Sequence, residues 1–537
     1  MRTLDATKSI PGVDRRLRDW DKADASKRLW AKDASWWKPG VNVPPELVDR
    51  LGWLEAPKAM AARAAEFTGF AEELKKEGVR DVVLLGMGGS SLFPDLLART
   101  FGSRPGYPAL TVLDLTHPDA VLAVRRRIDP AKTIFVVASK SGSTVETASL
   151  YEYFLGETKT ALGARAGERF VAITDPGTPF ERQAKDQGFR KIFLSPADVG
   201  GRFSALTPFG LAPAALLGLD PMALLEPALR MLTDCGPDRS ASHNPGLQLG
   251  AWLSEAALAG QDKVTLILSP GVAGFGAWLE QLVAESTGKE GKGILPIDDG
   301  ESPESFASED RVFVYVRVEG EADAAHDALA GELERSKRPI LVFNLRDRFQ
   351  LGAEVVRWEI ATAAAGAALG VNPFDQPNVQ ETKDLTKMIL SAPVSAPAKA
   401  ASWEDALSLA QRSRAGDYFA INAFVAGSPE ETAALTAFRR ALGARFRRPV
   451  TLGIGPRYLH STGQLHKGGA DKGVFFVMTS QPSQDAAIPG RPYAFARLIA
   501  AQAEGDLQAL VKRGRRAVRL DLGPAPAETL AKLTSSL

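Results

Sequence analysis

A cluster of hydroxyl side chains near residue 139 is the part of the chain best suited to binding an anion. The apolar run TIFVVA before it predicts a buried parallel strand, and the segment after it predicts a helix. Free N–H groups and the positive end of the dipole at a helix start attract an anion. The stretch SKSGSTVET adds Ser139, Lys140, Ser141, Ser143 and Thr144. A helix cap in a polar loop is the alternative, but a cap uses fewer hydroxyls. The stretch therefore predicts a phosphate site.

A glycine turn, GMGGSS at 86–91, follows the apolar run DVVLLG and opens a second predicted helix. The turn lacks the G-x-G-x-x-G pattern because Ser91 stands at its last position, and no Gly-Lys-Ser/Thr follows. Gly89 and Ser90 therefore favour a second phosphate turn. A tight structural turn is the alternative interpretation.

Two charged residues have the surroundings of catalytic groups. Arg202 follows Gly201 in VGGRFSALTPFG, where glycines allow close backbone approach to a ligand, and a cation there suits a developing oxyanion. Glu285 lies in the last turn of a helix predicted to end near Gly288. The negative end of the helix dipole there favours a proton-accepting carboxyl group. A surface salt bridge and a solvated helix-end glutamate are the respective alternatives.

Two later segments also carry chemistry-bearing side chains. Gln376 and Lys383 lie seven residues apart across a predicted loop-to-helix junction, where an ordinary polar loop is the alternative. His460 and His466 share one glycine-bearing segment after a predicted strand. Histidine suits proton transfer near neutral pH, whereas two solvated loop histidines are the alternative. A histidine pair without cysteine or paired carboxylates is a weak zinc signal.

Strands alternating with helices along most of the chain predict an α/β fold built on parallel sheets covered on both faces. Ligands bind beyond the carboxyl ends of the strands in such sheets, so the two phosphate turns are expected to face one pocket. We expect a helical segment at 1–50, α/β domains at 51–235 and 236–390, and an α/β region at 402–537. A small-residue, proline-bearing linker at 391–401 precedes the last region.

The composition limits the class of protein. The chain has 537 residues, too many for one core, and a net charge of +1, which gives no support for a polyanionic nucleic-acid partner. Its single cysteine, Cys235, excludes an internal disulfide and favours a reducing, cytoplasmic location. The start lacks an apolar signal region, and the longest apolar run, 360–371, is too short to span a membrane. Four tryptophans before residue 40 predict packing rather than a ligand platform.

Taken together, the motifs resemble those of the phosphoglucose isomerase family. The matching stretches are GMGGSS, SKSGSTVET, VGGRFSALTPFG, ESTGKEG, NPFDQPNVQETK and HSTGQLHKGG, which run from residue 86 to 469. No single stretch is specific for this family, but the six stretches together are. RLWAKDASWW and RYLHSTGQLHKGG are similar to the isomerase half of bacterial transaldolase–phosphoglucose isomerase fusions. The resemblance implies two sugar-isomerase domains, each a parallel sheet between helices.

The resemblance also implies an activity and a set of roles. The family interconverts glucose 6-phosphate and fructose 6-phosphate through an enediol, without a metal or redox cofactor. The carried-over roles are phosphate binding by Ser90, Ser139, Ser141 and Thr144 beside Lys140, proton transfer by Glu285, enediolate stabilisation by Arg202 after Gly201, ring opening by His460 with Lys383, and substrate contact by Gln376. The histidine commonly comes from the partner subunit, so a homodimer is implied.

One feature departs from the family pattern. The histidine motif at 460–466 follows the glutamine–lysine motif at 376–383, whereas it precedes that motif in most members. His466 is therefore an alternative to His460, although the H-S-x-G-Q pattern favours His460. Two other functions stay open: isomerisation of mannose 6-phosphate as well, and sugar-phosphate sensing without catalysis. Against the sensor, all of the residues with implied catalytic roles are present.

Overall fold

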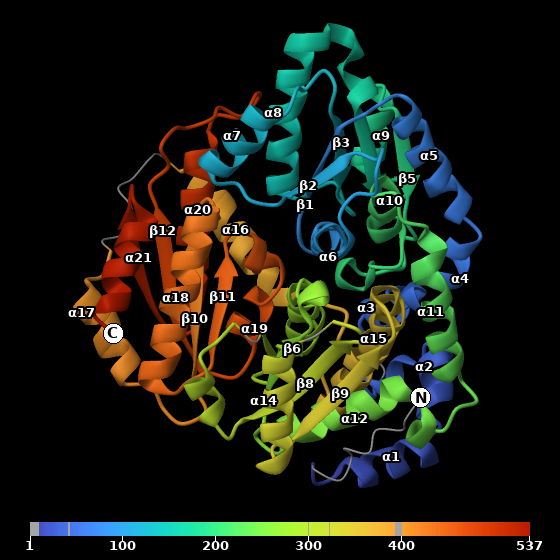
Figure 1. The fold of residues 1–537 in the computed structure, drawn as a ribbon, viewed down its shortest axis with the longest axis vertical. Helices are drawn as coiled ribbons and strands as arrows, with labels where there is room; N and C mark the ends of the chain where they lie inside the picture. The colour runs from blue at the N-terminus through green and yellow to red at the C-terminus, as the bar shows by residue number, and fades with distance from the viewer. Residues whose placement is uncertain (1–9, 41–42, 299, 322, 393–399) are drawn as a thin grey trace.

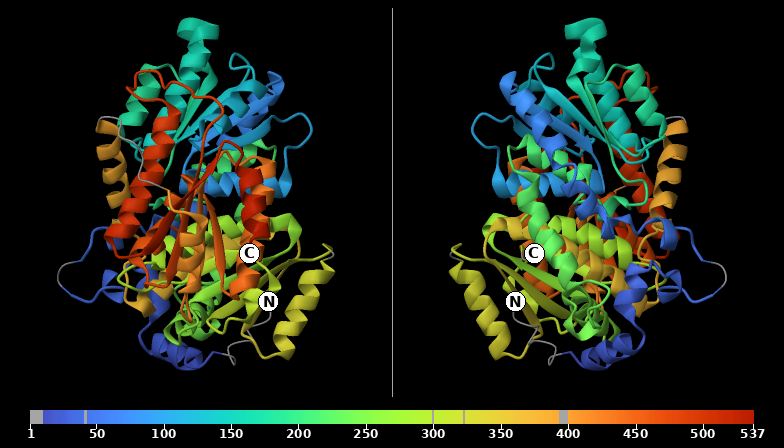
Figure 2. Two further views of the ribbon diagram at one scale, coloured as in Figure 1. Left: turned by 90° about the vertical axis from the view of Figure 1, so that its left-hand side faces the viewer. Right: turned by 90° about the vertical axis from the view of Figure 1, so that its right-hand side faces the viewer.

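The chain folds around three parallel β-sheets, seen in a computed structural model that describes residues 10–40, 43–298, 300–321, 323–392 and 400–537. Figure 1 shows the first sheet at the top, the second at the bottom and the third at the left. The side views in Figure 2 show helices packed around all three. Within the described ranges, none of the helices combines the length and the apolar character needed to cross a bilayer.

The first sheet has five strands in the order β2-β1-β3-β4-β5, all parallel. Alternate residues of β1 enter two different cores: Val82 and Leu84 pack on one face, and Val83 and Leu85 on the other. Helices therefore cover both faces, as predicted. The elements are β1 (Asp81–Gly86), α6 (Leu92–Phe101), β2 (Ala109–Leu113), α7 (Pro118–Arg127), β3 (Ile134–Ala138), α8 (Val145–Leu162), β4 (Phe170–Thr174), α9 (Pro179–Asp186), β5 (Lys191–Leu194), α10 (Pro208–Leu216) and α11 (Pro221–Asp234).

The second sheet has four parallel strands in the order β7-β6-β8-β9. Strand β8 is covered on both faces as well, because Val312 and Val314 join the large shared core while Phe313 and Tyr315 pack under α14. The elements are α12 (Pro245–Leu258), β6 (Lys263–Leu268), α13 (Phe275–Leu279), β7 (Leu295–Asp298), β8 (Arg311–Val318), α14 (Ala324–Arg335), β9 (Ile340–Leu345), α15 (Leu351–Leu369) and α16 (Pro377–Ser391).

The C-terminal region forms the third sheet, with four parallel strands in the order β11-β10-β12-β13. Its two faces also contribute to separate cores. We call residues 402–537 the C-terminal unit. Its elements are α17 (Trp403–Gln411), β10 (Tyr418–Phe424), α18 (Pro429–Phe446), β11 (Val450–Ile454), α19 (Gly463–Gly468), β12 (Gly473–Ser480), α20 (Phe495–Lys512), β13 (Arg516–Gly523) and α21 (Pro526–Ser535).

Buried charges fasten the C-terminal unit to the second sheet. Arg439 of α18 pairs with the Asp298 carboxylate and donates to its carbonyl oxygen at 3.1 Å. The Val450 N–H donates to Glu301 Oε1 at 2.6 Å, and Arg311 Nη1 donates to Glu301 Oε2 at 2.8 Å. The Glu301 and Arg311 side chains are both fully buried. Because an unpaired buried charge is strongly unfavourable, these contacts fix how the unit sits.

The N-terminal segment is helical, as expected, and its tryptophans serve packing. It contains α1 (Val13–Lys22), α2 (Ala25–Trp30) and α3 (Glu46–Asp49), and α4 (Ala56–Ala61) and α5 (Ala64–Lys76) follow it and lead into the first sheet. Trp20, Trp36 and Trp37 form a row with ring centroids 6.0 and 5.0 Å apart. Trp37 then meets Phe374 at 5.3 Å. The segment thus supports the loop before α16 directly.

The structure confirms the α/β class and the parallel sheets flanked by helices. Strands β5, β7 and β13, each at the edge of its sheet, have no long apolar run in the sequence that would predict them. In β5, for example, only one residue, Phe193, is buried. The division at residues 50, 235 and 390 stays a prediction. The predicted linker lies largely outside the described residues, because 393–399 are not among them.

Candidate active site

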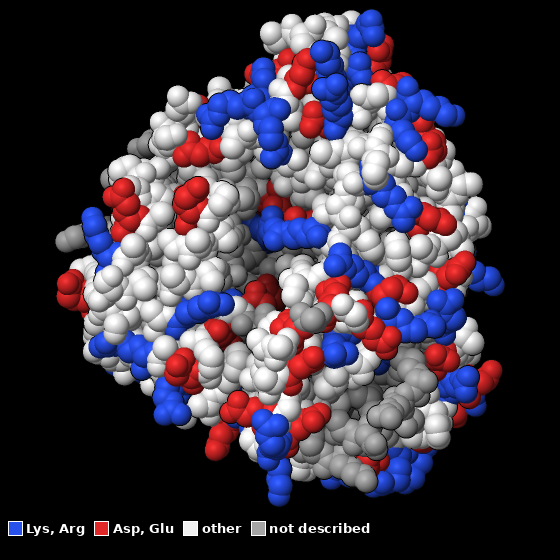
Figure 3. Space-filling model, viewed as in Figure 1, with Lys and Arg blue, Asp and Glu red and all other residues white. Residues whose placement is uncertain are grey.

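One cavity lies where the three sheets meet. It has a volume of about 300 Å³, at the small end of the range for small-molecule sites. Eleven of the twelve predicted site residues line it: Gly89, Ser90, Lys140, Ser141, Thr144, Gly201, Arg202, Glu285, Gln376, Lys383 and His460. Figure 3 shows a hollow near the middle of this face, with basic and acidic side chains gathered in it. Segments far apart in the sequence therefore converge on one small space.

The hydroxyl loop after β3 is shaped by its own side chains. Ser139 is buried and its Oγ accepts the Gly142 N–H at 3.1 Å, so it holds the loop and does not line the cavity. Gly142 has φ +71°, and an added Cβ would meet Phe180 at 2.4 Å. Thr144 precedes α8 but makes no side-chain capping bond. The Thr144 hydroxyl is therefore not used as a helix cap, contrary to the alternative interpretation, and can bind a ligand.

The glycine turn after β1 is packed against the opposite wall of the cavity. A Cβ on Gly89 would lie 1.9 Å from the Gly201 carbonyl oxygen. A Cβ on Gly88, which has φ +54°, would lie 2.7 Å from Gln281 Nε2 and 3.1 Å from His460 Cβ. Only glycine fits at these two positions. The turn thereby brings Ser90 within reach of residues from all three sheets.

Glu285 ends a π-helical segment, 280–285, that continues α13. Single π-helical turns often occur at functional sites. The carboxylate is 4% exposed; its Oε2 accepts a hydrogen bond from Gln281 Nε2 at 3.1 Å, and its Oε1 lies 3.7 Å from Arg202 Nη1. The helix ends close to Gly288, as predicted, but the π-helical geometry was not predicted. A buried carboxylate with one orienting donor is suited to taking a proton from a bound ligand.

Arg202 is almost fully committed to protein acceptors. Its Nε donates to Ser286 Oγ at 2.7 Å and its Nη1 to Gln376 Oε1 at 2.7 Å. Its Nη2 donates to the carbonyl oxygens of Pro373 and Asp375 at 2.5 and 3.0 Å. Guanidinium has five N–H donors, so one donor on Nη1 remains for a ligand. Burial lowers the pKa of Arg202, while Glu285 and Asp375 oppose that change, and an arginine stays charged.

His460 is held by a carboxylate from the first sheet. Its Nε2 lies 3.1 Å from Glu146 Oε1, which also accepts from Gln502 Nε2 at 2.8 Å. Burial would raise the pKa of Glu146, but His460 and Lys383 hold that pKa below its usual value. An ionised carboxylate only accepts, so Nε2 carries the proton and Nδ1 is left for a ligand. Thr116 completes the chain of contacts by donating to Gln502 Oε1 at 2.7 Å.

Comparison with known proteins identifies the family of this chain. The phosphoglucose isomerase family model matches residues 58–294. A glucose-6-phosphate isomerase from Rubrobacter xylanophilus is 31% identical over 397 residues, covering 65% of this chain and 90% of that protein. The chain belongs to the phosphoglucose isomerase family. A glucose-6-phosphate isomerase from Thermus thermophilus is 30% identical, with 68% and 94% covered.

Solved structures of this family and its neighbours share the fold. A hypothetical protein from Thermus thermophilus superposes with a TM-score of 0.61 at 27% identity, covering 72% of this chain and 99% of that one. A glucose-6-phosphate isomerase from Chlamydia trachomatis gives a TM-score of 0.55 at 20% identity, covering 70% and 85%. The second likeness concerns the fold alone.

The histidine segment differs from the arrangement that the phosphoglucose isomerase resemblance implies. His460 reaches the cavity from its own chain, so the geometric reason for expecting a partner's histidine is removed. The alternative of two solvated loop histidines is not supported either, because His460 ends a 3₁₀ turn, 457–460, and His466 lies within α19. The C-terminal unit supplies the histidine here because it is docked beside the first two sheets.

His466 lies outside the cavity. It is 2% exposed, its ring centroid is 5.0 Å from that of Phe475, and neither ring nitrogen has a hydrogen-bond partner among the described residues. Burial, together with Lys467 and Arg515, holds the pKa of His466 well below its usual value. The ring is therefore a neutral part of the core. Cys235 is inert too, since burial raises its thiol pKa to about 12.

Several residues at the site were not predicted. Gln281 stands four positions before Glu285 on one helix, a spacing that places side chains on the same face and could have revealed it. Glu146 lies inside the hydroxyl motif but has no sequence feature that marks it as the histidine's partner. Asp375 and the buried Lys289 lie 2.8 Å apart beside Arg202. The Lys289 ammonium also donates to the Asn372 carbonyl oxygen, so it fixes the loop before α16.

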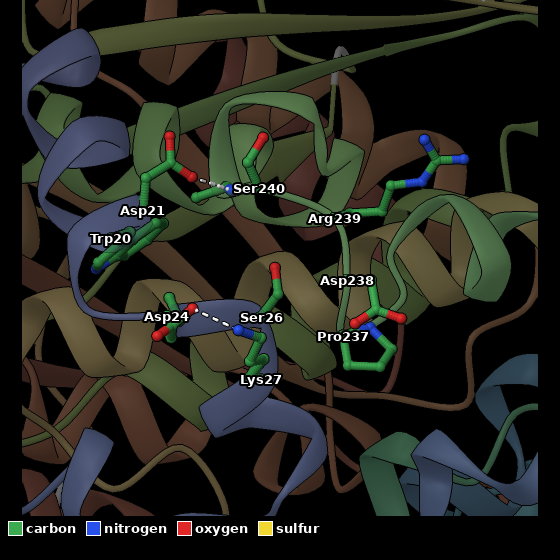
Figure 4. A pocket seen from close by; sticks show the side chains of 11 residues that line it. Trp20, Asp21, Asp24, Ser26, Lys27, Pro237, Asp238, Arg239 and Ser240 are labelled. Carbon is green, nitrogen blue, oxygen red and sulfur yellow. Dashed lines mark hydrogen bonds and ion pairs between the residues drawn. The ribbon is translucent and has the colours of Figure 1, made fainter.

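A second hollow of about 300 Å³ lies between the N-terminal helices and residues 237–241. Three of its charged side chains, Asp21, Asp24 and Lys27, are engaged with one another or with the backbone (Figure 4). Lys27 pairs with Asp24 at 3.0 Å, and the Asp21 carboxylate accepts the Ala241 N–H at 2.5 Å. This hollow contains none of the predicted site residues.

Proposed function

We propose that the cavity residues carry the interconversion of glucose 6-phosphate and fructose 6-phosphate, the reaction that family membership assigns to this chain. The observation that supports this most strongly is one small cavity that combines hydroxyl loops, a buried carboxylate, an arginine with one free donor and a carboxylate-held histidine. An aldose–ketose shift needs each of these groups.

At one end, Ser90, Ser141 and Thr144 bind the phosphate with the free N–H groups at the start of α8. Ser139 supports this loop from behind, and Lys140 and Gly89 complete the wall. The phosphate is remote from the reacting carbons, so its binding energy orients the sugar without taking part in the chemistry.

At the other end, His460 and Lys383 open the sugar ring. The Nδ1 lone pair of His460 takes the proton of the anomeric hydroxyl as the carbonyl forms and the bond from the anomeric carbon to the ring oxygen breaks. The ammonium of Lys383, which lies in the second turn of α16 and close to Glu146, donates a proton to that ring oxygen. Glu146 stabilises the imidazolium that forms when Nδ1 is protonated. The open-chain sugar is then the substrate for proton transfer.

Glu285 removes the proton from C2 of the aldose and returns it to C1, and the reverse reaction uses the same path. The free Nη1 donor of Arg202 binds the enediolate oxygens as negative charge develops on them. Gln376 and the carbonyl oxygens of the loop before α16 hold the guanidinium so that this donor faces the cavity. Gly201 lines the same wall without a side chain.

A location and an oligomeric state are also part of the proposal. The single buried cysteine favours a reducing, cytoplasmic location. A homodimer stays a prediction from the family resemblance, and with His460 supplied in cis we propose that each site works without a residue from a second copy.

The test is conversion of fructose 6-phosphate to glucose 6-phosphate, coupled to a glucose-6-phosphate dehydrogenase, with and without EDTA. Turnover that survives EDTA supports the enediol mechanism, and mannose 6-phosphate is then the next substrate to try. Saturable binding of fructose 6-phosphate without turnover would instead favour a sensor. Loss of turnover on chelation would contradict the metal-free roles given to Arg202 and Glu285.

A further inference from the structure

An arginine from the N-terminal segment reaches the phosphate end of the cavity. Arg50 follows α3 and lines the cavity. Its Nη1 donates to the Ala197 carbonyl oxygen at 3.0 Å, and Lys140 Nζ donates to the same oxygen at 3.0 Å. Two cations that share one acceptor must lie side by side. Arg50 is thereby located beside Lys140 of the hydroxyl loop.

The backbone around Arg50 is fastened to the site loop. The Gly52 N–H donates to the Asp198 carbonyl oxygen at 2.9 Å, and Leu51 forms an isolated bridge with Val199. Residues 198–199 lead directly into the Gly200–Arg202 turn. The position of Arg50 therefore follows from main-chain contacts and does not depend only on a long side chain.

At the hydroxyl-loop end of the cavity, Arg50 is the cation whose charge is available to a bound anion. Lys140 is paired with the Asp175 carboxylate, so its charge is already compensated. Burial raises the pKa of Asp175, and the charges of Lys140 and Arg50 act in the opposite direction, which shows that Arg50 lies within electrostatic reach of the pair. Within the described part of the chain, Arg50 forms an ion pair only with Asp49, with 3.8 Å between Nε and Oδ1. At that distance there is no hydrogen bond to the Asp49 carboxylate, although Nη1 also donates to the Asp49 carbonyl oxygen at 3.4 Å. Among the described residues, the donors on Nε and Nη2 make no hydrogen bond and are available to a ligand.

We propose that Arg50 binds the substrate phosphate and supplies the charge that the hydroxyl loop lacks. The proposal rests on the proposed function, because it names a further binding residue of the same site. A sugar phosphate carries nearly two negative charges at neutral pH, whereas hydroxyls and backbone N–H groups carry no net charge. The planar guanidinium binds two phosphate oxygens at once, which an ammonium cannot do. The N-terminal segment thus contributes to substrate recognition as well as to packing.

The test compares Arg50→Met and Arg50→Lys with a matched control, Arg63→Met. Arg63 also donates to a backbone carbonyl of the first sheet, Leu194 at 2.9 Å, and its side chain is 31% exposed against 34% for Arg50. Arg63 does not line the cavity. The KM and kcat for fructose 6-phosphate are measured, together with inhibition by sorbitol 6-phosphate and by sorbitol. Calorimetry with inorganic phosphate reports binding independently of turnover.

For Arg50→Met we expect KM and the sorbitol 6-phosphate inhibition constant to rise roughly 10- to 100-fold, the usual loss for a charge-assisted hydrogen bond. Inhibition by sorbitol and the kcat should stay within about twofold. Arg50→Lys should recover part of the loss, and Arg63→Met should behave as wild type. Equal losses for sorbitol and sorbitol 6-phosphate, or unchanged phosphate binding in Arg50→Met, would overturn the proposal. A wild-type protein that binds phosphate through Arg50 but does not turn over would instead count against the proposed function alone.

Discussion

Replacing Glu285 by glutamine should abolish proton transfer while leaving the cavity intact. The amide oxygen of glutamine can still accept the hydrogen bond from Gln281 Nε2, now 3.1 Å long, so the side chain keeps its position. An amide is not basic at neutral pH. A positioned general base contributes roughly 10²–10⁴-fold to a rate, which corresponds to about 3–5 kcal/mol of the barrier. We expect kcat to fall by that factor and KM to change little.

The same substitution should strengthen the binding of an anionic enediolate mimic. Glu285 Oε1 lies 3.7 Å from Arg202 Nη1, a separation worth about 4 kcal/mol of attraction at an effective dielectric constant of ~20. Once the carboxylate is gone, the arginine charge is no longer offset. A five-carbon aldonic acid 5-phosphate carries a carboxylate where the enediolate oxygens form. We expect its inhibition constant in Glu285→Gln to fall by about tenfold, since solvent in the cavity weakens the full Coulomb effect.

Glu280→Gln is the matched control, because Glu280 lies in the same π-helical segment. Burial and Asp298 raise the pKa of Glu280 to about 8, so its carboxyl is largely protonated at pH 7 and glutamine is a close mimic. The coupled dehydrogenase assay and exchange of the C2 proton with solvent measure both variants. Near-normal turnover in Glu285→Gln would refute the assignment of the base. Unchanged inhibitor affinity would refute the electrostatic part of the reasoning.

Three further predictions concern other parts of the molecule. His460→Asn should lower kcat/KM for fructose 6-phosphate by roughly 10²-fold, yet spare 5-deoxyfructose 6-phosphate, which cannot close a furanose ring; equal losses on both would contradict a ring-opening role. Lys289 has a pKa lowered to about 7 by burial and by Arg202, against 10.5 when unfolded. Between pH 7 and 10 the unfolded protein therefore binds more protons at Lys289 than the folded protein does. The free energy of unfolding of the wild type should then increase by a few kcal/mol relative to that of Lys289→Met as the pH rises from 7 to 10. Parallel urea midpoints for the two proteins across that range would disprove this. Glu301→Leu leaves the buried Arg311 charge without a partner and should lower the free energy of unfolding, measured in urea, by about 3–5 kcal/mol. Adding Arg311→Met should restore part of this loss. An unchanged free energy of unfolding in Glu301→Leu would show that this ion pair does not hold the C-terminal unit.

The parts of the fold that the sequence predicts are those whose local pattern agrees with their final surroundings. The runs that became β1, β3 and β6 are apolar throughout because both faces of these strands are covered. Strand β7, with only four residues, carries too short a pattern to identify. Its pairing with β6 is decided by tertiary contacts alone.

In the candidate site, too, some residues are predicted by local sequence patterns and others are positioned only by tertiary contacts. Residues set in glycine-rich or hydroxyl-rich turns, such as Ser90 and Thr144, could be singled out because turn chemistry is local. Arg50 gave no signal, since its relation to Lys140 exists only through a shared carbonyl oxygen far along the chain. The motif order of His460 indicated that something differed from the family pattern. Only the docking of the C-terminal unit explains how one chain supplies that histidine.

The position of His460 also has a consequence for biosynthesis. All other predicted site residues lie between 89 and 383, whereas His460 and the β-strands that hold it lie in the C-terminal unit. Domains generally fold in the order of their synthesis, from the N-terminus. A nascent chain should therefore acquire its phosphate loops, its base and its arginine while the histidine is still inside the ribosome or not yet made. We expect such a chain to hold a sugar phosphate before it can open the ring, so that translation and docking of residues 402–537 complete the active site.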